Sequence, residues 1–155
     1  MKLEIDEKKA KLLYPDAPKL LRQELEDKFG VDFFKEKEFE KIKIFNDACI
    51  VCETTEEEFN SKFMNIGLDL DTINYEKSKI IVKAINNGWI PDWNNSNQPK
   101  WFPVFKLSSG FGFSSSHFGY DCTHTDCGSR LCFESEEKSN HAAKQFIDIY
   151  QKFII

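Results

Sequence analysis

The chain of 155 residues has the length of one domain and can bury a hydrophobic core without disulfides or metal ions. Hydrophobic residues make up 41% of it and charged residues 30%, which is the composition of an ordinary soluble globular protein. The net charge of −5 argues against strong electrostatic attraction to nucleic-acid phosphates. Nucleic acid is therefore a disfavoured, although not an excluded, partner.

The first residues, MKLEIDEKKAKLL, lack the apolar run of a secretory signal, and no later stretch is apolar enough for a membrane span. Five cysteines without an export signal predict free thiols in a reducing compartment, and their odd number argues against a disulfide framework. We therefore expect a cytoplasmic protein with no membrane partner. No phosphate-binding glycine loop, H-E-x-x-H pair or nucleophile elbow is present, and we expect no cofactor.

Residues 1–88 carry most of the charges and show helical periodicity. The first predicted helix has Asp16 as its N-cap and Pro18 in its first turn, and it ends at Gly30. One apolar stripe, formed by Phe39, Ile42, Phe45, Cys49 and Cys52, predicts the second helix.

Two further helices complete this region. Thr55 and Glu58 have the spacing of a capping box, and the helix that they begin ends at Gly67. The next predicted helix runs from about residue 75 to residue 87, and Gly88 stops it.

After Gly88 the apolar period changes from that of a helix to that of strands. The segments WFPVFKL (101–107) and FGFSSSHF (111–118) predict a hairpin, and SRLCF (129–133) predicts a short third strand. Ser135 is the expected N-cap of a final helix, which should cover one face of the sheet because a lone three-stranded sheet needs a covering layer.

The predicted fold class is therefore α+β: N-terminal amphipathic helices, a small antiparallel three-stranded sheet, and a C-terminal helix packed on it. We expect a single domain over residues 1–155, with 1–88 mainly helical and 89–155 containing the strands and the last helix. No long linker, repeat or low-complexity run interrupts the chain.

The segment WIPDWNNSNQPKWF (89–102) is the main candidate for a ligand or partner surface. Indole rings beside side-chain amides offer a flat apolar face with paired donors and acceptors, as a sugar or nucleobase site requires. The alternative is that the Asn and Pro residues form turns while the tryptophans fill the join between helices and sheet. The candidate binding residues are Trp89, Trp93, Asn94, Asn95 and Trp101.

The stretch DCTHTDCGSRLCF (121–133) contains three cysteines at five-residue intervals. Cysteine and histidine are zinc ligands, so Cys122, Cys127 and Cys132 with His124 or His117 form a candidate zinc site. The usual structural sites consist of two tight pairs, and this spacing differs. The competing interpretation, which we favour, is an irregular connection into a buried strand that uses sulfur for packing.

Cys49 and Cys52 form a C-x-x-C motif, but both lie on the apolar stripe of a predicted helix, which explains them as core residues. A Cys–His nucleophile pair among residues 117–132 is a third possibility, although nothing in the sequence marks an oxyanion hole or an oriented base.

Four segments carry a resemblance to a known group: FGVDFF (29–34), FNDAC (45–49), the run from 89 to 114, and GSRLCFESEEKSNHAAKQF (128–146). Together they resemble uncharacterised small proteins of gut Bacteroidetes and of their phages and mobile elements. The resemblance implies a cytoplasmic accessory protein of phage-related origin, and it implies no activity, substrate or catalytic residue.

These observations predict a non-enzymatic accessory or protein-interaction module that contacts an unknown protein partner through the aromatic region 89–120. That region combines low charge with high aromatic content, as the cores of interfaces do. A nucleic-acid-binding regulator that stacks bases on aromatic rings is the second hypothesis, and a cysteine-nucleophile enzyme is the third.

Overall fold

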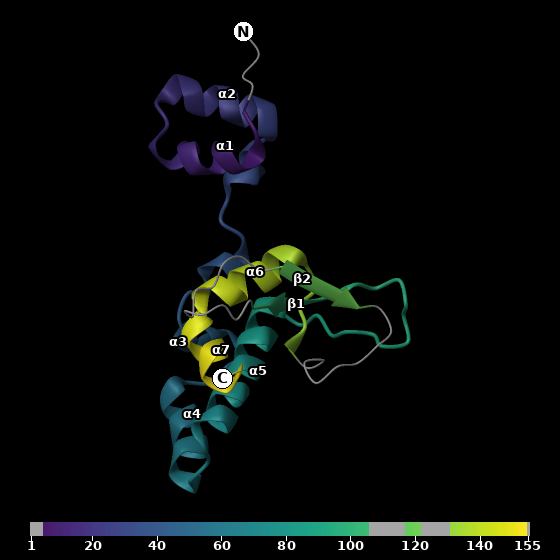
Figure 1. Ribbon diagram of the computed structural model, residues 1–155. Coiled ribbons are helices and arrows are strands. Elements are labelled where there is room, and N and C mark those ends of the chain that lie inside the picture. Colours follow the sequence, from purple (N-terminus) through teal and green to yellow (C-terminus); the bar gives the residue numbers. More distant parts are fainter. Residues whose placement is uncertain (1–4, 106–116, 122–130, 155) are drawn as a thin grey trace, which may run out of the picture. The chain divides into compact units, whose positions relative to one another are not determined.

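The computed structural model describes residues 5–105, 117–121 and 131–154, and the chain divides into two compact units, Met1–Lys37 and Glu38–Ile155 (Figure 1). The first unit contains α1 (Glu7–Leu13), η1 (Tyr14–Asp16), α2 (Lys19–Phe29) and η2 (Val31–Phe34), where η denotes a 3-10 helix. The second unit contains η3 (Glu38–Lys41), α3 (Phe45–Val51), α4 (Glu56–Phe63), η4 (Met64–Ile66), α5 (Leu70–Asn86), β1 (Lys100–Val104), β2 (His117–Asp121), α6 (Glu136–Gln145) and α7 (Ile147–Ile154).

The first unit has a small interior. Among its described residues, Ala10 and Leu25 are the buried hydrophobic side chains. The Tyr14 ring stacks on Phe34 with ring centroids 3.9 Å apart, and the Tyr14 hydroxyl donates a hydrogen bond to the Glu26 carboxylate. Rings therefore supply much of the apolar contact that this short helical unit makes.

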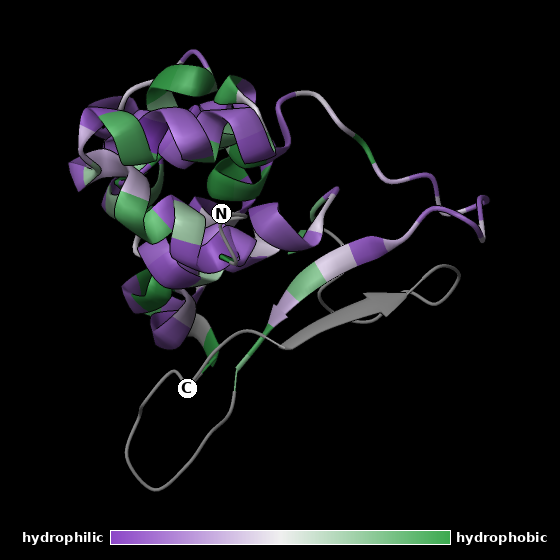
Figure 2. Ribbon diagram, turned by 90° about the horizontal axis from the view of Figure 1, so that it is seen from above, coloured by the Kyte–Doolittle hydropathy of each residue, from purple (hydrophilic) through white to green (hydrophobic). Residues whose placement is uncertain are grey.

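Helix α5 is the centre of the second unit. It packs against α7, α3 and α6, and Figure 2 shows hydrophobic and hydrophilic segments alternating along the helices. Ile81 and Ile85 are fully buried on α5, and Tyr150 packs into the same core from α7. Residues before and after Gly88 thus share one core, so Gly88 is not a boundary between two compact units. A single domain over the whole chain stays a prediction.

Several helix ends follow from local capping chemistry. Thr55 and Glu58 form the predicted capping box at the start of α4, which is confirmed. The Ser135 hydroxyl accepts a hydrogen bond from the Lys138 amide and caps α6, which is also confirmed. Helix α5 begins earlier than predicted, because the Asp69 carboxylate accepts a hydrogen bond from the Thr72 amide and caps it there.

The predicted helix over the stripe from Phe39 to Cys52 is interrupted. The Asp47 carboxylate accepts hydrogen bonds from the backbone amides of Lys43 and Ile44, at 2.8 and 3.0 Å, and these bonds fix the start of α3 at Phe45. The stripe still faces inward, since Ile42, Phe45 and Cys49 are buried and Phe39 and Cys52 are partly buried against them.

The predicted fold class, α+β with a three-stranded antiparallel sheet, is wrong. The described chain is mainly helical, and its paired strands are β1 and β2, of five residues each (Figure 1). The two strands are antiparallel with Trp101 opposite Tyr120. Of the predicted third strand, 129–133, Phe133 forms one isolated bridge to Trp101, while residues 129 and 130 lie outside the described residues. The predicted final helix is also divided, into α6 and α7.

Proline explains why this third segment does not extend into a strand. Trp101 and Phe133 exchange both backbone hydrogen bonds, at 3.0 and 2.6 Å. In an antiparallel pair the next hydrogen-bonding positions on the same edge of β1 lie two residues away, at 99 and 103. Both are proline, which has no N–H to donate, so each of these two pairs would lack one of its two hydrogen bonds and the ladder is weakened in both directions.

Candidate functional site

A pocket of about 340 Å³ lies where α3 and α5 end. Val51 and Cys52 come from the end of α3, Lys83 comes from the last turn of α5, and Trp89 and Ile90 begin the loop that follows α5. The described residues that line it are Val51, Cys52, Lys83, Asn87, Gly88, Trp89 and Ile90. Most of these side chains are apolar, and the packing of α3 on α5 brings them together.

The backbone beside the pocket turns sharply after each helix. Asn87 has φ 48° and ψ 53°, and Gly88 has φ 88°. Left-handed backbone suits asparagine and glycine, so this pair ends α5 and redirects the chain, and the Trp89 amide donates to the Asn86 carbonyl at 3.1 Å. After α3, Glu53 also has a positive φ, of 58°. Two tight helix ends therefore place short, exposed segments around one pocket.

Several apolar side chains at this site are open to water. Ile90 is 79% exposed and Val51 is 47% exposed, and Ile50, next to Val51 in α3, is 63% exposed. Figure 2 shows a short hydrophobic stretch in the loop that follows α5, and hydrophilic residues after it. The pocket and the exposed Ile50 together are called the α3/α5 patch below.

Among the described residues that line the pocket, Lys83 is the charged one. Within the described part of the chain its ammonium group forms no hydrogen bond or ion pair, whereas Lys79 on the same helix pairs with Glu76. Burial raises the pKa of the Cys52 thiol, and the positive charge of Lys83 opposes that rise. The pocket therefore combines apolar walls with a single unneutralised cation.

Of the five candidate binding residues, Trp89 lines the pocket, and the other four lie elsewhere. Trp93, Asn94 and Asn95 belong to a loop that is held by its own hydrogen bonds. The Asn94 amide donates to the Asp92 carboxylate at 2.9 Å, and Lys100 donates to the Asn95 carbonyl at 3.0 Å. These contacts favour the interpretation of the loop as a set of turns.

The environments of Trp93 and Trp101 differ from that of Trp89. The ammonium of the buried Lys100 lies 5.4 Å from the centre of the Trp93 ring, so a cation already occupies one side of that ring. Trp101 is partly buried in β1 and packs against the core. The structure therefore does not assemble the three tryptophans into one stacking platform.

The candidate zinc ligands Cys122, His124 and Cys127 lie outside the described residues. His117 lies in β2, and Cys132 is a free, buried thiol. Among the described residues, no group of three or more potential ligands could hold a metal ion.

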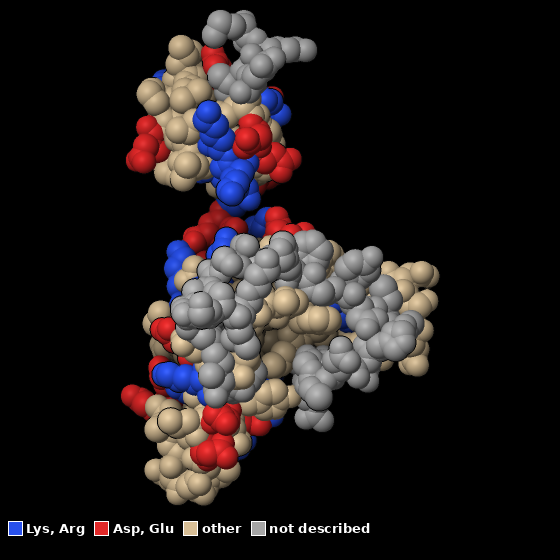
Figure 3. Space-filling view, in the orientation of Figure 1, with Lys and Arg blue, Asp and Glu red and all other residues tan. Residues whose placement is uncertain are grey.

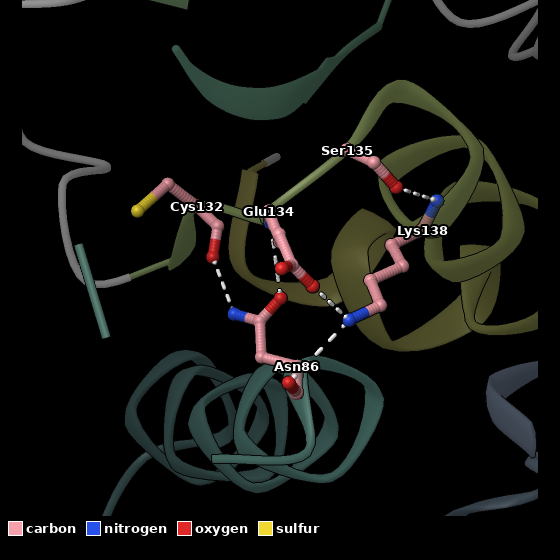
Figure 4. Close-up of polar contacts among 5 residues, drawn as sticks. All are labelled: Asn86, Cys132, Glu134, Ser135 and Lys138. Carbon is pink, nitrogen blue, oxygen red and sulfur yellow. Dashed lines mark hydrogen bonds and ion pairs between the residues drawn. The ribbon is translucent and has the colours of Figure 1, made fainter. Parts of the chain in front are cut away.

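The backbone around Cys132 is held by a clamp (Figure 4). The Asn86 side-chain amide donates to the Cys132 carbonyl at 2.9 Å, and the Glu134 amide donates to the Asn86 side-chain oxygen at 3.1 Å. Lys138 donates to the Asn86 carbonyl at 3.4 Å and pairs with Glu134. One side chain at the end of α5 thus satisfies two backbone groups of the segment before α6, which holds the backbone of the buried Cys132 in place.

The thiols that the structure describes are unsuited to nucleophilic chemistry at neutral pH. Cys49 is fully buried, and burial raises its pKa. Burial also raises the pKa of Cys132 to about 11, against the opposing effects of a backbone hydrogen bond and of Lys100. Reactive cysteines need the reverse shift, toward the thiolate.

The raised pKa of Cys132 predicts a loss of stability at alkaline pH. Between pH 9 and about 11 the unfolded chain releases the thiol proton and the folded chain keeps it, so the free energy of unfolding should fall as pH rises through this range. Urea unfolding at several pH values, compared with Cys132→Ala, measures the contribution. The variant should lose less stability over this range than the wild type, and equal pH slopes would contradict the burial of this thiol.

Sequence reasoning identified Trp89 but missed Val51, Lys83 and Ile90. A signal was available for two of them. Val51 does not belong to the apolar stripe that faces the core from its helix. Ile90 lies in a loop, where no helix or strand pattern requires an apolar residue. Lys83 carried no such signal, because the lack of a partner carboxylate among the described residues can be recognised only in the folded structure.

Within the described ranges, no helix has both the length and the apolar character needed to cross a bilayer. The resemblance to small proteins of gut Bacteroidetes stays a prediction, since nothing found bears on it. No family model, no curated protein and no solved structure matches the chain.

Proposed function

We propose that this protein is a non-enzymatic accessory protein that binds a protein partner through the α3/α5 patch. The observation that supports the proposal is the exposure of Ile50, Val51 and Ile90 around a pocket that Trp89 also lines. Exposed apolar groups that gather at one site commonly mark a surface that a partner covers. Interface cores are likewise rich in aromatic and poor in charged residues.

Two further observations fit this proposal better than its alternatives. On the face of the second unit in Figure 3, Lys and Arg side chains are interspersed with Asp and Glu, which gives little support to a nucleic-acid surface. The described cysteines are free thiols, which suits a reducing cytoplasm, and their raised pKa values give no support to a cysteine nucleophile.

A comparison of two matched variants tests the proposal. Val51→Ser combined with Ile90→Ser makes the α3/α5 patch polar, and Leu70→Ser changes an apolar residue at the start of α5 whose exposure lies between those of Val51 and Ile90. In affinity capture from cells that express the protein, Leu70→Ser should retain the wild-type partners and the double variant should lose them. Thermal unfolding of both variants checks that they are folded. Retention of every partner by a folded double variant would refute the α3/α5 patch as the contact surface.

A further inference from the structure

The chemistry of the pocket indicates what kind of partner segment it accepts. A volume of about 340 Å³ is at the lower end of the range for ligand sites, which extends from roughly 300 to 1,000 Å³. Such a space fits one or two side chains of a peptide better than a large cofactor. The apolar walls formed by Val51, Trp89 and Ile90 require that the inserted group be apolar.

Charge supplies the second requirement. Lys83 is the one charged side chain of the lining, and among the described residues it has no ion pair or hydrogen bond. The other lysines of α5 are engaged: Lys79 pairs with Glu76, and the Lys77 ammonium lies 4.9 Å from the centre of the Phe45 ring. The chain as a whole has a net charge of −5, so a pocket whose charge is positive is a local exception.

We propose that the α3/α5 patch recognises a short acidic peptide segment of a partner protein, which inserts an apolar side chain between Val51 and Ile90 and places a carboxylate against Lys83. This inference rests on the proposed function and adds the chemistry of the partner. The apolar side chain supplies most of the affinity, and the ion pair with Lys83 selects segments with Asp or Glu beside the anchor. A basic segment is disfavoured because it would bring a like charge to Lys83.

Selection from a random peptide library tests this proposal even while the partner is unidentified. Wild-type protein should enrich peptides that combine a Leu, Ile, Met or Phe anchor with at least one neighbouring Asp or Glu. Lys83→Glu should enrich peptides with the same anchors and with Lys or Arg in place of the acidic residue. For an enriched acidic peptide, Lys83→Met should weaken binding about two- to fivefold, which is the effect of an exposed ion pair.

The variants separate the failure of this inference from the failure of the proposed function. If the Val51→Ser, Ile90→Ser double variant selects the same peptides as the wild type, the α3/α5 patch is not the contact surface and both proposals fail. If the double variant loses the enrichment but Lys83→Glu leaves the selected charges unchanged, the patch binds peptides and the acidic preference is wrong. Absence of any enriched peptide with the wild-type protein would overturn the peptide proposal itself. Binding at two salt concentrations adds a check, because the acidic preference should weaken with added salt.

Discussion

Replacing Asn86 by leucine should lower the free energy of unfolding by about 2 to 4 kcal/mol. The side chain is 5% exposed, and its amide satisfies the Cys132 carbonyl and the Glu134 amide. Leucine has a similar volume but offers no donor or acceptor, so both backbone groups lose this partner. Each buried polar group left without a partner costs about 1 to 3 kcal/mol. Urea unfolding followed by circular dichroism measures the change.

Asn94→Leu is the matched control, because it makes the same substitution at an exposed asparagine whose side chain anchors no distant segment. Its effect should stay within about 0.5 kcal/mol, as is usual for surface positions. Hydrogen exchange adds a local measurement: the Glu134 amide should exchange faster in Asn86→Leu than in the wild type. A loss below about 0.5 kcal/mol in Asn86→Leu would mean that the clamp adds nothing to stability.

The Asn86 clamp is an example of a structural feature that could not be predicted from the sequence alone. Helix starts at Thr55 and Ser135 were predictable, because a cap depends on residues within one turn of each other. The clamp joins residues 46 and 48 positions apart, and no local pattern reveals such a pair. Cys132 is buried, as its apolar neighbours in the sequence suggested, but the partner that holds its backbone could not be predicted from them.

The three-stranded sheet was wrongly predicted for a different reason, because the sequence itself contains residues that argue against it. The alternating pattern of WFPVFKL predicts a strand, but the prolines at positions 99 and 103 supply no N–H donor on either side of Trp101 along the same edge. The early start of α5 was likewise readable from Asp69, which has the same capping chemistry as Thr55. The two prolines and Asp69 are local signals in the sequence, and a prediction based on hydrophobic periodicity does not take them into account.

The candidate site could be predicted only in part, because its residues come from separate segments of the chain. Trp89 and Ile90 are adjacent in the chain, whereas Val51 and Lys83 reach the same pocket through the packing of α3 on α5. A hydrophobic pattern predicts that two helices have apolar faces, but it does not predict which turns of those faces meet. The exposure of an apolar side chain is also a tertiary property, so the site became visible from burial and not from residue type.

Ile81→Ala and Ile90→Ala remove the same atoms from two isoleucines of opposite environment, and their results should differ sharply. Ile81 is fully buried at the centre of α5, and its truncation should cost about 2 to 5 kcal/mol through lost apolar contact and a residual cavity. Ile90 is 79% exposed, so its truncation should change the free energy of unfolding by less than about 0.5 kcal/mol. Denaturant titration of both variants beside the wild type gives the two values.

The two variants distinguish an isoleucine that stabilises the fold from one that is free to contact a partner. If Ile90→Ala proved as destabilising as Ile81→Ala, Ile90 would belong to the core. Its exposed surface would then give no support to a binding role. If Ile90→Ala leaves stability unchanged, an apolar side chain in contact with water at the rim of a pocket has no folding role to explain it. Isoleucine exposed in this way gains nothing from burial in the free protein, and the partner-capture comparison with the Val51→Ser, Ile90→Ser double variant then decides whether a partner removes it from water.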